Sequence, residues 1–109
     1  MPIEDNKERK NKTLMSLILP EFILGIGKVL TFGATKYYPY SWKKVTNPID
    51  TYIDALDRHI LAFKTGNIYD DETKLHHLFH AATNLMFIWW HSKYNVNAYK
   101  EYRARQYKI

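Results

Sequence analysis

The stretch that decides the fold lies at residues 70–93 and reads DDETKLHHLFHAATNLMFIWWHSK. Its apolar residues recur at helical spacing, and Asp70 or Asp71 offers a capping side chain at its start. We therefore expect a helix from these acids to about Lys93. Apolar positions cover more than half of its circumference, which predicts burial on several sides and, in a chain this small, packing against a second subunit.

The same stretch gathers histidines, acids and an amide. His77, His80 and Asn84 share one helical face because they are spaced by three and four residues. Neutral imidazole is a metal ligand near neutral pH, and a cysteine-free set of imidazoles and carboxylates suits Mg²⁺, Mn²⁺, Zn²⁺ or Fe²⁺. Two interpretations stay open: a metal or phosphate site, or histidines that only hydrogen-bond to neighbouring helices.

An earlier helix is expected from Pro20, a residue that fits the first turn, to Gly33, a typical end signal. Gly25 and Gly27 lie within it and weaken it by roughly 1 kcal/mol each relative to alanine. They therefore indicate that another backbone or a ligand approaches closely at this point.

The middle helix has the clearest boundaries. Asn47 is a capping amide, Pro48 suits the first helical position, and the apolar spacing continues to about Lys64, after which Gly66 closes the helix. Residues 37–47, before it, form an aromatic loop without periodicity.

These elements predict an all-α fold: a small bundle of three main helices plus a short C-terminal helix, completed by oligomerisation. The expected organisation is a flexible lead-in at residues 1–13, one helical domain at 14–94, and a basic tail or short helix at 95–109.

Composition limits the function classes. The chain has 109 residues, no cysteine and a net charge of +5. Residues 98–109 carry four bases and one acid, whereas residues 13–97 carry eight bases and seven acids, so nucleic acid is not the expected partner. No apolar run is long enough to span a bilayer, and the charged N-terminus lacks a secretion signal, so we expect a cytoplasmic protein without a membrane partner.

Further candidate residues lie outside the histidine stretch. Lys36 and Arg58 could bind phosphate, and Tyr37 or Trp42 could stack on a base. His59 lies beside the apolar stripe of the middle helix, so its side chain should point at or next to the core of the protein. The alternatives are a solvated Arg58, aromatic rings that close the end of the bundle, and a core histidine.

Four motifs follow one another along the chain: Phe32-Gly33-Ala34-x-Lys36-Tyr37, Trp42, Tyr52-x-x-Ala55-x-x-Arg58-His59, and Glu72-Thr73-x-Leu75-x-His77-Leu78-x-His80-Ala81-x-x-Asn84. In this order they resemble the phage-associated dATP/dGTP diphosphohydrolase N-terminal-type domain, from about Pro20 to Trp90.

The resemblance implies a helical protein of bacteriophage or bacterial origin, acting in the host cytoplasm if phage-encoded. The implied reaction is metal-dependent hydrolysis of a purine deoxynucleoside triphosphate to the monophosphate and pyrophosphate. The resemblance also implies a fold akin to MazG-type all-α pyrophosphohydrolases, which are oligomers. The chain departs from the MazG pattern, because His77-x-x-His80 stands where that pattern has carboxylate pairs.

Two hypotheses follow for the site. In the first, an enzyme uses His59, His77 and His80 for catalysis, with Mg²⁺ or Mn²⁺ as the cation. The expected metal ligands are His77, His80, Asp71 and Glu72, and the expected nucleotide-binding residues are Lys36, Tyr37, Trp42, Arg58 and Asn84. In the second, a non-catalytic phage protein sequesters a nucleotide in the same pocket.

Overall fold

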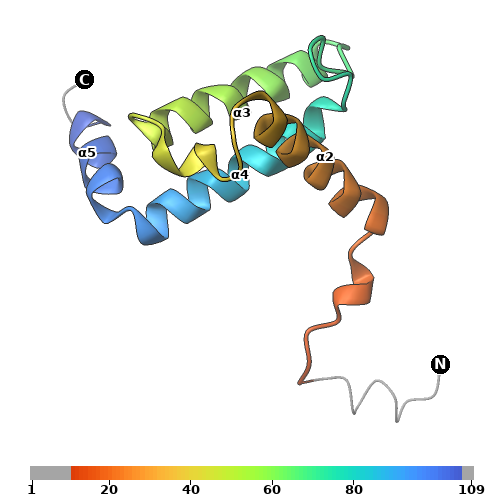
Figure 1. Ribbon diagram of the computed structural model, residues 1–109, viewed down its shortest axis with the longest axis horizontal. Helices are drawn as coiled ribbons and strands as arrows, with labels where there is room; N and C mark the ends of the chain where they lie inside the picture. The colour runs from red at the N-terminus through yellow and green to blue at the C-terminus, as the bar shows by residue number, and fades with distance from the viewer. Residues whose placement is uncertain (1–10, 107–109) are drawn as a thin grey trace.

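The computed structural model describes residues 11–106, which form helices joined by loops (Figure 1). In chain order the elements are η1 (Met15–Leu17), α2 (Pro20–Lys36), η2 (Ser41–Lys44), α3 (Pro48–Lys64), α4 (His77–Tyr94) and α5 (Val96–Gln106). Within this part of the chain, strand-like pairing is limited to one bridge between Tyr69 and His76. The all-α prediction is confirmed. The expected lead-in falls mostly on residues outside this range, as do the last three residues of the expected tail.

The helices α3 and α4 form the centre of the molecule. They run in opposite directions side by side, joined by a loop at one end (Figure 1). Helix α2 packs on α4, and α5 contacts both central helices at the opposite end. An ion pair between Arg105 and Asp50 ties α5 to the start of α3. No helix of residues 11–106 is both long enough and apolar enough to cross a membrane.

The expectations for α2 are partly right. The helix begins at Pro20 as expected, but it continues past Gly33 to Lys36, where the Tyr37 N–H bonds to the Gly33 carbonyl. Gly33 keeps a negative φ, so it does not form the left-handed turn that ends a helix. A Cβ at Gly25 would lie 2.5 Å from the Phe79 ring, so the close neighbour is a side chain and not the expected backbone or ligand. A Cβ at Gly27 would meet no atom within 4 Å, so that expectation is wrong.

Helix α3 has the expected bounds, Pro48 to Lys64, and Gly66 follows it with φ +94°. The expected amide cap is absent, because the Asn47 side chain makes no capping bond. Asn47 instead has a left-handed backbone, and its carbonyl accepts the Thr51 N–H at 3.0 Å.

Helix α4 begins at His77, seven residues after Asp70, so the predicted start is wrong. The Asp70 carboxylate accepts the backbone N–H groups of Glu72 and Thr73, at 3.1 and 2.9 Å, and so caps a turn instead of a helix. Lys74 has φ +62°, which folds the loop back until the Asp70 N–H reaches the Leu75 carbonyl.

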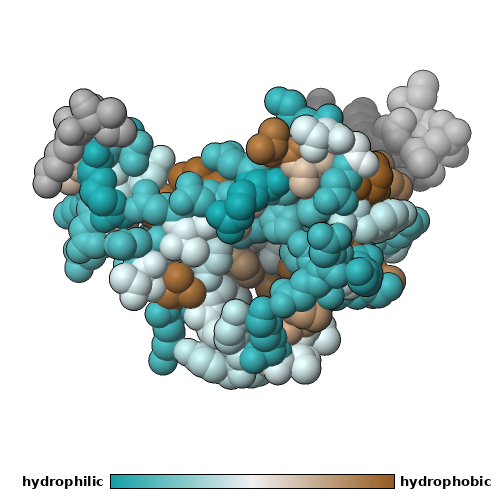
Figure 2. All heavy atoms as spheres, turned by 90° about the horizontal axis from the view of Figure 1, so that it is seen from above, coloured by the Kyte–Doolittle hydropathy of each residue, from teal (hydrophilic) through white to brown (hydrophobic). Residues whose placement is uncertain are grey.

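The buried apolar core of the described residues is small. Ile49 and Ala81 are 2% and 4% exposed, whereas four polar side chains are buried, those of His77, Thr83, Asn84 and His91. Apolar side chains remain on the surface (Figure 2), among them Leu85 and Trp89 of α4 at 54% and 55% exposure. Helix α4 is therefore exposed on part of the surface that its sequence predicts to be buried.

Candidate functional site

A cavity of about 770 Å³ lies between the second half of α2, η2 and one side of α4. Aromatic rings from the loop after α2 and from η2 form much of its wall, including those of Tyr37, Tyr40 and Trp42. Polar side chains of Lys36, Glu72, Thr73 and His80 also line it. The cavity thus joins an aromatic region, suited to a flat ring, to a region with charged and imidazole groups.

Three histidines meet beside this cavity, one from α3 and two from α4. The Nδ1 atoms of His59 and His77 are 2.8 Å apart. The His80 ring is stacked on the His59 ring with centroids 4.5 Å apart and an interplanar angle of 8°. His80 lines the cavity. The stacked pair of His80 and His59 therefore connects the cavity to the more deeply buried His77.

One carboxylate joins this group. Asp70, His59 and His77 each offer a ligand atom within 4.8 Å of the others, a spacing at which they could hold a metal ion. The Asp70 Oδ2 atom accepts hydrogen bonds from Glu72 and Thr73. Its Oδ1 atom makes none of the hydrogen bonds seen within residues 11–106.

The hydrogen-bonding capacity of His77 is not filled. Its side chain is 6% exposed, and Nε2 has no partner among residues 11–106. The contact with His59 uses only Nδ1, so Nε2 stays unpaired in either tautomer. An unpaired buried polar atom costs about 1–3 kcal/mol, so His77 keeps an unused hydrogen-bonding position in the interior.

The charge states suit a metal site. Burial and the neighbouring His80 and His77 lower the pKa of His59 to about 4, so the ring is neutral and can act as a ligand. Burial also lowers the pKa of His80. Burial opposes ionisation of Asp70, but hydrogen bonds from Thr73 and the nearby histidines hold the pKa of this carboxyl below its usual value.

The structure brings several expected residues together. His59, His77 and His80 form one cluster, and Lys36, Tyr37 and Trp42 line the adjoining cavity. Trp42 is part of the wall, since its ring stacks on Phe87 at 4.6 Å, whereas Tyr37 is 66% exposed. Lys36 donates to Glu72 at 2.8 Å, a hydrogen bond that raises the pKa of Lys36.

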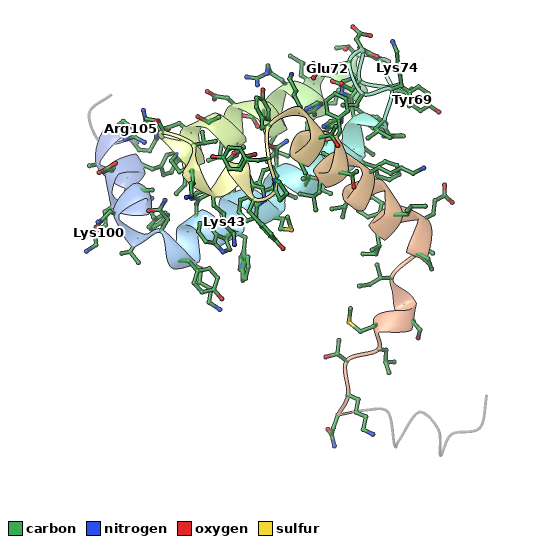
Figure 3. All side chains as sticks on the ribbon, in the orientation of Figure 1. Lys43, Tyr69, Glu72, Lys74, Lys100 and Arg105 are labelled. Carbon is green, nitrogen blue, oxygen red and sulfur yellow. The ribbon has the colours of Figure 1, made fainter. Side chains whose placement is uncertain are left out.

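Other expected residues lie elsewhere. Arg58 is exposed on α3 and does not line the cavity. Asn84 is buried, and its amide donates to the His80 carbonyl one turn earlier, at 2.8 Å. Of the acids expected with His77 and His80, Asp71 is exposed outside the three-residue group. Glu72 lies in the loop between α3 and α4 (Figure 3) and forms an ion pair with Lys36.

Two residues of the cluster were not expected from the sequence: Thr73 as a site residue and Asp70 as a metal ligand. The Thr73 hydroxyl is 3.1 Å from Asp70 Oδ2 and 2.7 Å from His80 Nε2. The available signal was the spacing Asp70-x-x-Thr73, because aspartate commonly accepts backbone N–H groups two and three residues later in a turn.

Fold and site together define a class: a small helical protein whose central helix pair carries a histidine–carboxylate cluster beside an aromatic cavity. The chain belongs to the family described as dATP/dGTP diphosphohydrolase, N-terminal, whose model matches residues 3–101. A protein of Salmonella phage PMBT28 named dATP/dGTP diphosphohydrolase is 42% identical over 81 residues.

Those 81 residues are 74% of this chain and 27% of the phage protein, so the match spans about a quarter of that relative. No solved structure matches the chain.

Proposed function

We propose that this domain hydrolyses a purine nucleoside or deoxynucleoside triphosphate to the monophosphate and pyrophosphate, with the help of a divalent cation. The family and the printed name of the phage relative support the reaction class. The observation that carries the proposal is the buried, unfilled imidazole of His77 in a group with His59 and Asp70, next to a cavity with a lysine at its rim.

The donor set bears on the choice of cation. His59, His77 and Asp70 would hold it, with two imidazoles and one carboxylate. Imidazole suits Zn²⁺ or Fe²⁺ best and Mg²⁺ prefers oxygen ligands; of the two expected cations, Mn²⁺ is the transition metal and so the one that better tolerates two imidazoles. A divalent cation supplies stabilisation of negative phosphate oxygens and lowers the pKa of water.

The residues of the chain have separate roles in the proposed reaction. A water oxygen bonds to the α-phosphorus and its proton passes to the His80 ring or to solvent, while the bond from that phosphorus to the bridging oxygen breaks and pyrophosphate leaves. Lys36 would exchange its partner Glu72 for the phosphate oxygens and offset their charge. Tyr37 and the wall formed by Trp42 would hold the base. His80, on the cavity surface, would contact the reacting end of the substrate.

We also propose that the domain works as a homo-oligomer. The segment from η1 into α2 exposes Met15, Leu17, Leu19 and Ile23 at 51–75%. Several exposed large apolar side chains within one short segment favour an interaction site. Multi-angle light scattering would give a dimer or larger assembly, and a monomer at micromolar concentration would contradict this proposal.

The reaction is tested by anion-exchange analysis of a panel of dNTPs and NTPs after incubation with Mn²⁺, with Mg²⁺, or with EDTA. We expect metal-dependent conversion of a purine triphosphate to its monophosphate and pyrophosphate. His77→Asn should abolish it, and Asp57→Asn, which changes an exposed carboxylate on α3, should not.

If the wild-type protein leaves every nucleotide of the panel unchanged, the proposed hydrolysis is contradicted. Stoichiometric binding with the nucleotide recovered intact would then favour the sequestering function.

A further inference from the structure

The Thr73 hydroxyl lies at the centre of a small hydrogen-bond network in the loop between α3 and α4. Its Oγ1 atom is 2.7 Å from His80 Nε2, 3.1 Å from Asp70 Oδ2 and 3.2 Å from the backbone nitrogen of Leu75. A hydroxyl can donate one hydrogen bond and accept two. Three neighbours therefore fill its capacity, provided that two of them donate and one accepts.

The direction of each bond follows from the chemistry of the partners. The Leu75 N–H can only donate. The ionised Asp70 carboxylate can only accept, so the Thr73 proton points to Oδ2. The remaining partner, His80 Nε2, must then be the second donor. The reverse arrangement, with the proton on the His80 side, would leave two oxygen acceptors facing each other at 3.1 Å.

This assignment fixes the tautomer of a neutral His80. With the proton on Nε2, the lone pair of the ring is on Nδ1. Nδ1 has no hydrogen-bond partner among the residues that the structure describes, while the ring itself lines the cavity and is held flat against His59. The ring therefore offers an unoccupied acceptor beside the space proposed for substrate.

We propose that Thr73 is a positioning residue that, with Asp70 behind it, holds His80 as the Nε2–H tautomer and so makes Nδ1 a hydrogen-bond acceptor for water or substrate in the cavity. The role given to Nδ1 rests on the proposed function, whereas the tautomer rests on the geometry alone. Thr73 itself acts through His80, in the way that hydrogen bonds from outer residues fix the orientation of catalytic imidazoles.

The tautomer is tested first in the wild-type protein without nucleotide, by two-bond ¹H–¹⁵N correlation spectra of the histidine rings. His80→Gln identifies the His80 signals by their loss. We expect the His80 pattern of an Nε2–H imidazole with an unprotonated Nδ1. The opposite pattern, with the proton on Nδ1, would overturn the inference whatever the enzyme does.

Two variants then connect the tautomer to turnover. Thr73→Ser keeps the hydroxyl, and we expect the wild-type tautomer and a kcat within about threefold of wild type. Thr73→Val keeps the shape without the hydroxyl, and we expect loss of the pure Nε2–H pattern. Its kcat should fall by about 10- to 100-fold, as for other orienting partners, with KM changed much less. Thr51→Val is the matched control, since this exposed threonine on α3 does not line the cavity.

The outcomes separate the two proposals. A Thr73→Val protein with the wild-type tautomer and kcat would overturn the positioning role. If Thr73→Val fails to fold, the wild-type spectrum and the Thr73→Ser variant decide the tautomer. If the wild-type protein shows no turnover, the proposed function fails and with it the role of Nδ1, while the tautomer stands or falls on the spectrum.

Discussion

Two buried histidines of α4 show what burial alone does not reveal. His91 is 0% exposed and both of its ring nitrogens are paired: Nε2 contacts the Trp42 carbonyl at 3.0 Å, and Nδ1 contacts the Asn95 amide at 3.1 Å. The carbonyl accepts and the amide donates, so one neutral tautomer satisfies both. His77 is 6% exposed and has an unpaired Nε2. The difference separates a histidine that stabilises the fold from one available for a ligand.

The two histidines also have different surroundings. The His91 ring packs against Trp42, Trp90 and Tyr52, far along α4 from the α3–α4 loop. The His77 ring meets His59, and Asp70 lies close by. Aromatic neighbours with filled hydrogen bonds typify a core, whereas neighbouring imidazoles and a carboxylate typify a ligand site.

The largest expected effect is on activity at His77. His77→Asn should lower triphosphate hydrolysis by more than about 100-fold, because it removes one of the three groups proposed to hold the cation. Initial rates with excess Mn²⁺ measure this. Equal rates for the variant and the wild-type protein would remove the functional distinction between His77 and His91.

The next effect concerns stability at His91. His91→Ala should lower the free energy of unfolding by about 2–4 kcal/mol, since it deletes two buried hydrogen bonds and the packed ring. Urea denaturation provides the value, and Mn²⁺ affinity at a temperature where the variant stays folded should match wild type. A large loss of Mn²⁺ affinity would show that His91 also serves the ligand site.

Asp70 and Asp71 are adjacent acids that should differ in their contribution to Mn²⁺ binding. Asp70→Asn should weaken Mn²⁺ binding by about 10- to 100-fold, whereas Asp71→Asn should change it by less than about threefold, because only Asp70 lies within 4.8 Å of the histidine ligands. Isothermal titration calorimetry with Mn²⁺ alone compares them. The opposite ranking would restore the ligand set expected from sequence.

Lowering the pH should reduce the free energy of unfolding through protonation of His59. Its pKa is about 4 in the folded chain against 6.5 in a model peptide, so the unfolded chain binds this proton more tightly. Stability is therefore fully present above about pH 6.5 and is lost as the pH falls toward 4. After allowance for partial exposure to solvent, the loss is about 1–2 kcal/mol. Urea titrations at pH 7 and 4.5, compared with His59→Gln, should show a smaller loss in the variant; equal losses would rule out His59 as the source.

The smallest effect on stability is expected at the cavity rim. Lys36→Ala should change the free energy of unfolding by less than about 1 kcal/mol, because exposed ion pairs contribute little. It should nevertheless raise KM for the triphosphate about tenfold by removing a phosphate partner. Lys64→Ala on α3 is the matched control. A KM unchanged by Lys36→Ala would mean that the substrate does not replace Glu72.

Local sequence predicted much of the fold. Pro20, and Pro48 with Gly66, marked the correct helix boundaries, because these residues act on the backbone next to them. The start of α4 could not be placed in this way. Asp70 can cap either a helix or a turn, and the choice depends on the loop folding back at Lys74 onto residues 68–70.

The candidate site was predicted in part for the same reason. Helical spacing brought His77 and His80 to one region, but it could not show that His80 stacks on His59 of another helix. It also could not separate His77 from His91, because their difference lies in the Trp42 carbonyl, 49 residues away in sequence. Asp70 enters the cluster through the tertiary course of its loop, not through its place on a helix.

The central claim is that His59, Asp70 and His77 hold a divalent cation beside the cavity. The most direct test is a crystal of the protein grown with Mn²⁺, with diffraction data collected to locate manganese by anomalous scattering. We expect an anomalous peak among these three side chains, within about 2.0–2.3 Å of ligand atoms from each. A well-ordered cluster with no peak, or a peak elsewhere in the molecule, would contradict it.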